Sequence, residues 1–151
     1  LKIKVDYPNK QEEKQILSRM GSFHSRPIAK SILSKEELLK ARQLVDDIYV
    51  DEKVIDYIVN LVFASRDPQK YCSQCSPWIE CGASPRASLS FLAAAKARAF
   101  MEGRGFVSPH DIKVLAPHIL SHRLKISYEA EAEEITSEKV IAHILNSIPV
   151  P

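Results

Sequence analysis

The stretch Gly82-Ala83-Ser84-Pro85-Arg86-Ala87 carries the strongest helix-start signal in this chain of 151 residues. A serine side chain can cap the free N–H groups of a helix, and proline suits the first helical position because its φ is already helical. Residues 87–101, which follow, are rich in alanine and contain no glycine or proline. A long helix is therefore predicted after Ser84, and Gly103 is expected to end it.

Arg86 lies in the first turn of that helix, where its charge meets the positive end of the helix dipole. A cation there is unfavourable by about 0.3–1 kcal/mol, unless a negative partner outside the helix offsets the cost. The planar, permanently charged guanidinium suits phosphate oxygens, and helix N-termini attract anions. Two interpretations stay open: Arg86 contacts a phosphate, or it is a surface arginine paired with a nearby carboxylate.

Similar cap signals, each followed by apolar residues at spacings of three and four, predict helices along the rest of the chain. Ser34 and Glu37 form a capping box, and Ser108 with Pro109 repeats the serine–proline start. The predicted helices begin next to Asn9, Ser34, Asp51, Ser84, Ser108 and Thr136 or Ser137. The fold class is therefore all-α, a bundle of about five to six helices.

Three local features modify this prediction. A turn is expected around Pro27. Pro117 should kink its helix or end it early, because proline removes a backbone donor. The β-branched residues at 32–33 and 48–50 allow a minor strand pair.

The charge balance argues against nucleic-acid binding. The 21 basic and 19 acidic residues give a net charge of +2, far from the strongly basic balance of most helical DNA-binding domains. No apolar run approaches the roughly 20 residues needed to cross a bilayer, and the first residues do not resemble a signal peptide. We expect a cytoplasmic protein with no nucleic-acid partner and no membrane insertion.

Residues 1–8 alternate between apolar and charged side chains, which is the pattern of a β-strand. A strand needs a partner to satisfy its backbone hydrogen bonds, and no second strand of this kind follows. We therefore expect residues 1–8 to complete a sheet that lies outside this chain, and residues 9–151 to form the helical domain.

Cys72, Cys75 and Cys81 lie close together in a segment without clear periodicity. A closed zinc site needs four ligands, and no second Cys-x-x-Cys or Cys-x-x-His supplies the fourth. No metal is therefore expected, and reduced thiols are favoured over a metal centre.

The sequence lacks the usual phosphate-binding and hydrolytic motifs. It contains no Gly-x-x-x-x-Gly-Lys-Ser/Thr loop and no Gly-x-Gly-x-x-Gly, and only four glycines in all. Catalysis by this chain alone is not expected. The acid pairs 46–47 and 133–134 are interpreted as solvated helix faces.

Four segments together resemble the C-terminal region of the MoxR family of AAA+ ATPases: residues 82–87, 102–104, 107–112 and 120–124. The similarity extends over most of the chain. It implies that residues 1–8 are the last strand of the ATPase core and that residues 9–151 are the C-terminal helical lid. The segment that holds the three cysteines departs from the family pattern.

The resemblance also implies roles for particular residues. Arg86 corresponds to the sensor 2 arginine, which reaches the γ-phosphate of ATP, and Ser84 lies beside it at the phosphates. Arg123 and Arg66 would approach the nucleotide or a neighbouring subunit, although structural salt bridges are favoured for both.

The implied partners belong to the full-length protein. They are its own ATPase core, ATP with Mg²⁺, further copies in a homo-oligomeric ring such as a hexamer, and client proteins that hydrolysis remodels. No bound cofactor is expected for this chain alone. The alternative is a non-enzymatic helical adaptor that binds protein through an exposed helix face.

Overall fold

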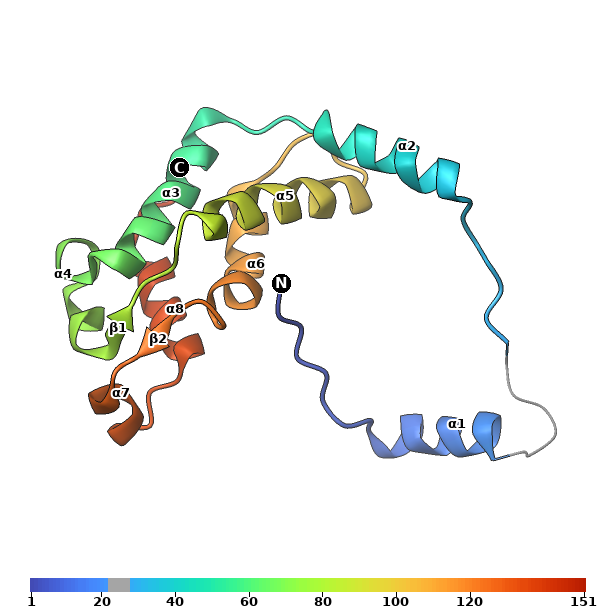
Figure 1. The fold of residues 1–151 in the computed structure, drawn as a ribbon, viewed down its shortest axis with the longest axis horizontal. Coiled ribbons are helices and arrows are strands. Elements are labelled where there is room, and N and C mark those ends of the chain that lie inside the picture. The colour runs from blue at the N-terminus through green and yellow to red at the C-terminus, as the bar shows by residue number, and fades with distance from the viewer. Residues whose placement is uncertain (22–27) are drawn as a thin grey trace. The chain divides into compact units, whose positions relative to one another are not determined.

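The computed structural model describes residues 1–21 and 28–151, which divide into two compact units. The larger unit comprises Leu1–Lys2 and Arg42–Pro151, and the smaller comprises Ile3–Ala41. Helices dominate both units, so the all-α prediction is confirmed (Figure 1). The predicted turn around Pro27 lies outside the described residues.

The smaller unit holds α1 (Lys10–Met20) and most of α2 (Lys35–Asp46). Both helices begin where their caps predict: Asn9 and Glu12 form a capping box on α1, and Ser34 and Glu37 exchange hydrogen bonds at the start of α2. Neither helix buries a residue. Their local sequence thus sets where they begin, without help from a core.

The larger unit is built on four long helices: α3 (Glu52–Arg66), α5 (Arg86–Met101), α6 (Pro109–Leu120) and α8 (Ser137–Ser147). Helix α5 buries Ala87, Phe91, Ala95 and Ala99 at a spacing of four, so one stripe of mostly small side chains faces the core. Full burial of Phe91 alone contributes about 1.5–3 kcal/mol.

Asp111 connects α5 to α6 through an ion-pair cluster. Its carboxylate is fully buried and accepts hydrogen bonds from Arg98 Nε at 3.1 Å, from both Arg104 terminal nitrogens at 2.7 and 2.9 Å, and from Ser108. Glu102 pairs with the same two arginines at 2.6 and 2.7 Å. Asp111 also forms a capping box with Ser108, where the serine–proline pair predicted a helix start.

Short elements fill the connections and raise the number of helices above the five to six expected. Between α3 and α5 lie α4 (Pro68–Tyr71), the 3-10 helix η1 (Ser73–Trp78) and β1 (Ile79–Cys81). Between α6 and α8, where the sequence predicted no helix or strand, lie β2 (Lys125–Ile126) and α7 (Tyr128–Ala132). β1 and β2 pair in antiparallel fashion, with Ile79 opposite Ile126.

Several local predictions are corrected. The segment at 48–50 does not pair with 32–33: Tyr49 donates to the carbonyl of Gly105 and accepts from the amide of Val107, both at 3.0 Å. That partner is remote in sequence, so local patterns could not reveal it. Pro117 does not end α6, which continues to Leu120.

The thiol prediction is wrong for two of the three cysteines. Cys72 and Cys75 are buried and joined by a disulfide, and only Cys81 is free. The two cysteines flank the first turn of η1, where the backbone folds back sharply enough to bring their Cα atoms to 5.4 Å.

Residues 1–8 form no strand in this structure, and their apolar side chains are exposed. Their pairing with a sheet of the ATPase core therefore stays a prediction. Within the described ranges, no helix is both long and apolar enough to span a bilayer.

Candidate functional site

The loop that leads into α5 lies against the last turn of α3. A Cβ on Gly82 would overlap the backbone oxygen of Ser65, so this position requires glycine. The next residue, Ala83, is buried; its amide donates to Ser65 Oγ at 3.0 Å, and its carbonyl accepts from Arg66 Nε at 2.6 Å. Close packing and two hydrogen bonds therefore fix the entry to α5.

Replacement of Gly82 by alanine is expected to destabilise the protein by about 1–3 kcal/mol, because the added methyl group forces the loop off α3. Urea unfolding followed by circular dichroism measures the change. Gly105→Ala is the matched control: a Cβ there meets no atom within 4 Å, so a change below about 0.5 kcal/mol is expected. Equal losses for the two variants would contradict the close packing of Gly82.

Helix α5 begins at Arg86, one residue later than the sequence predicted. Pro85 takes the cap position with helical backbone angles, and the carbonyl of Ser84 accepts from the amide of Ala87 at 2.8 Å. The Ser84 hydroxyl is exposed and makes no hydrogen bond within the described residues, so the predicted side-chain cap is wrong. Proline's fixed φ starts the helix instead.

The side chain of Arg86 is exposed at this helix start. Within residues 1–21 and 28–151 it forms no salt bridge. The unfavourable position of a cation at the positive end of α5 is therefore not offset by a carboxylate in the part of the chain that the structure describes.

Arg123 is joined to the same end of α5. Its Nη2 donates to Ser90 Oγ at 3.1 Å, and that hydroxyl donates in turn to the carbonyl of Arg86 at 2.9 Å. Its Nε is buried and has no hydrogen-bond partner among the described residues. The structure thus links Arg123 to the backbone of Arg86, two residues 37 positions apart that the sequence proposed separately (86 to 123).

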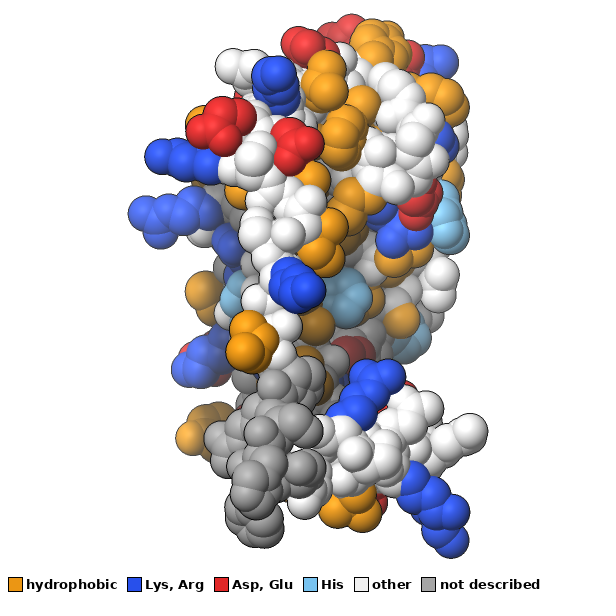
Figure 2. Space-filling model, turned by 90° about the vertical axis from the view of Figure 1, so that its right-hand side faces the viewer, with side chains coloured by type: hydrophobic (Ala, Val, Ile, Leu, Met, Phe, Trp, Pro, Cys, Tyr) orange, Lys and Arg blue, Asp and Glu red, His pale blue; other side chains and the backbone are white. Residues whose placement is uncertain are grey.

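Lys2, near the start of the chain, lies against the last turns of α6. The amide of Lys2 donates to the carbonyl of His118 at 2.8 Å, and the His118 ring donates from Nδ1 to the carbonyl of Lys2 at 3.1 Å. Burial, followed by the charges of Arg123 and Lys2, lowers the pKa of His122. Lysine and arginine side chains are exposed on the face seen in Figure 2.

Arg66 has a structural role and does not belong with the basic side chains near Arg123. Its Nε holds the carbonyl of Ala83, and its guanidinium lies over the Phe63 ring, 5.0 Å from the centroid. Neither Arg66 nor Arg123 forms a salt bridge within the described ranges, so that prediction is wrong for both. Hydrogen bonds to backbone and hydroxyl oxygens take its place.

The same helices and loop occur in known proteins. Residues 73–144, which include the loop and Arg86, match the family described as the AAA lid domain. The chain is 40% identical over 151 residues to chaperone MoxR1 of Mycobacterium tuberculosis and 31% identical over 150 residues to the uncharacterized protein YeaC of Bacillus subtilis. Each alignment covers 99% of this chain.

A crystal structure of a candidate ATPase from Cytophaga hutchinsonii superimposes with a TM-score of 0.92 at 34% identity, over 97% of this chain. The chain belongs to the MoxR family of AAA+ ATPases. The resemblance seen in the sequence is thereby confirmed, and the helical unit is a MoxR-type lid.

This MoxR-family chain spans less than half of the proteins it matches. It covers 40% of MoxR1, 44% of YeaC and 45% of the Cytophaga structure. Within the described residues, no three His, Cys, Asp or Glu side chains are placed to hold a metal ion together.

Proposed function

We propose that this chain is the lid that closes over ATP bound by the ATPase core of the full-length protein, and that Arg86 acts as its sensor 2 arginine. One observation carries the proposal: Arg86 is exposed at the start of α5, on a loop fixed to α3, with no carboxylate partner among the described residues. A terminal phosphate would supply the missing negative charge.

The surroundings of Arg86 support an anionic ligand. Arg123 is joined to the first turns of α5 through Ser90, and Lys2 adds a positive charge beyond it; burial and both charges lower the pKa of His122. We propose that Arg123 strengthens the field at the phosphates and that the exposed Ser84 hydroxyl faces them. Mg²⁺ would neutralise phosphate charge when bound, with ligands supplied by the core rather than by the lid.

The chemistry of the lid follows from the charge that develops during phosphoryl transfer. A guanidinium fixed by a rigid loop costs little to reorganise, so it can stabilise the departing terminal phosphoryl group. Loss of that group would release Arg86 and let the lid move. We propose that this movement remodels client proteins within a homo-oligomeric ring.

The alternative is a non-enzymatic adaptor. One observation favours it: Ile55, Ile58, Val59, Leu89 and Leu92 line an apolar groove between α3 and α5. An adaptor that used only this groove would not depend on Arg86.

Nucleotide affinity tests the proposal directly. In the full-length protein, Arg86→Ala is expected to weaken ATP binding about tenfold and leave ADP binding unchanged, because only ATP carries the phosphate that Arg86 contacts. Titration with fluorescent ATP and ADP analogues measures both affinities. Arg42→Ala, which removes another exposed arginine, is the control. Equal loss for ATP and ADP, or no loss for either, would refute the sensor role.

A further inference from the structure

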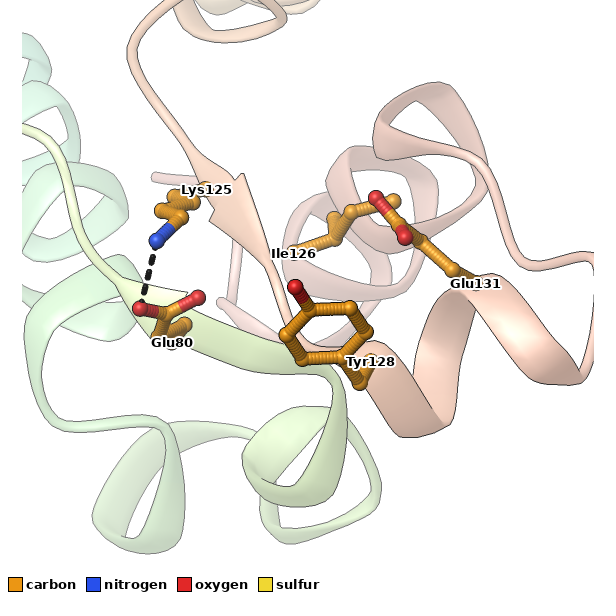
Figure 3. Close-up of a pocket in the computed structure, with 5 residues that line it drawn as sticks. All are labelled: Glu80, Lys125, Ile126, Tyr128 and Glu131. Carbon is orange, nitrogen blue, oxygen red and sulfur yellow. Dashed lines mark hydrogen bonds and ion pairs between the residues drawn. The ribbon is translucent and has the colours of Figure 1, made fainter.

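A separate pocket lies on the β1–β2 side of the larger unit, lined by Glu80, Lys125, Ile126, Tyr128 and Glu131 (Figure 3). Lys125 Nζ pairs with Glu80 Oε1 at 2.6 Å across the two strands. Tyr128 is 85% exposed, and Figure 3 shows its ring between Glu80 and Glu131. An apolar floor, an aromatic wall and two carboxylates thus surround one opening.

Contacts between segments about 50 residues apart hold this pocket in shape. The Ser127 amide donates to the carbonyl of Trp78 at 3.0 Å, and its hydroxyl donates to the carbonyl of Pro77 at 2.6 Å. Trp78 Nε1 donates to Glu133, the residue directly after α7, at 3.3 Å. Because these bonds and the strand pairing fix α7 against β1, the pocket is formed before any ligand arrives.

The charge around the pocket is strongly negative. Residues 127–138 contain five glutamates and no lysine or arginine. The one cation that lines the pocket, Lys125, is 68% exposed, and its partner Glu80 is 47% exposed. An ion pair this open to water contributes little to stability, so Glu80 can exchange its partner at low cost.

We propose that this pocket binds an arginine side chain from a basic segment of a partner protein. The guanidinium lies against the Tyr128 ring, its planar fork pairs with the Glu80 and Glu131 carboxylates, and Lys125 swings into solvent. Arginine fits better than lysine because its flat group stacks on an aromatic ring and pairs with a carboxylate through two parallel hydrogen bonds.

The test uses the full-length protein and a labelled nine-residue peptide of alternating arginine and glycine, titrated at low and at physiological salt. We expect saturable binding that Tyr128→Ala and Glu131→Gln each weaken about fivefold. Glu129→Gln is the matched control, because it removes the same charge from the same helix at a residue that does not line the pocket. It should change the affinity less than twofold.

Two further measurements separate the pocket from a general negative field. The lysine counterpart of the peptide should bind several-fold more weakly than the arginine peptide. Tyr128→Phe should retain the affinity that Tyr128→Ala loses, since the ring survives. Equal weakening by Glu129→Gln and Glu131→Gln, or no saturable binding below about millimolar peptide, would overturn the proposal.

Discussion

Replacement of Arg86 by alanine is expected to slow ATP turnover by the full-length protein by about 100- to 1000-fold. Removal of one fixed donor at a developing charge typically has an effect of this size. Arg86 is exposed and has no carboxylate partner in the described residues, so its loss should leave the lid folded. Steady-state phosphate release at saturating ATP measures the effect, and circular dichroism checks the fold.

A second substitution at the same position sharpens that test. Arg86→Lys keeps the charge and loses the planar fork, so its turnover should fall between those of the wild type and Arg86→Ala. Arg42→Ala should turn over ATP at the wild-type rate. Full activity in Arg86→Ala would exclude the sensor role and favour the adaptor alternative.

Replacement of Asp111 by asparagine is expected to destabilise the protein by about 3–5 kcal/mol. The carboxylate is fully buried, and its loss removes the negative partner of two arginines, Arg98 and Arg104, that converge on it. A loss of this size is a large part of the stability of a small domain. Urea unfolding measures it. Glu102→Gln removes a more exposed acid of the same cluster and should cost no more than about 1 kcal/mol.

The same carboxylate predicts an acid dependence of stability. Burial alone raises the pKa of Asp111, but hydrogen bonds from Arg104 and Ser108 outweigh it and lower the pKa to about 2. The unfolded value is about 3.9, so the stabilisation is present above about pH 4 and is lost as the pH falls toward 2. Asp111→Asn should flatten the fall in stability across this window. An unchanged pH profile in the variant would contradict the assignment.

Local signals predicted most of the long helices correctly. The caps at Asn9, Ser34, Asp51 and Thr136 bond the first-turn amides as expected, because capping depends on residues two or three positions apart. Ser84 failed because the adjacent proline sets the backbone by itself. The sequence pattern located the start of α5, but it could not show whether Ser84 or Pro85 starts the helix.

Features that depend on contacts between distant segments could not be predicted from the sequence. The strand pairing of 79–81 with 125–126 involves runs of three and two residues, too short to show a period. Nothing in the sequence around Asp111 showed that Arg98 and Arg104 would both reach its carboxylate. The acid pair 133–134 was interpreted as a solvated helix face, whereas the pocket nearby exists only once Glu80 is brought next to Lys125.

The sequence by itself determined where the long helices begin and that Arg86 stands at the start of a helix. These features depend on interactions between residues within one turn of the chain, so neighbouring residues are enough to predict them. Only the tertiary structure decided that Gly82 presses against α3, that Arg123 joins Arg86 through Ser90, and that Glu80, Tyr128 and Glu131 share one pocket. Each of these requires the core to form first, because burial of apolar side chains, rather than any local preference, brings the distant segments together.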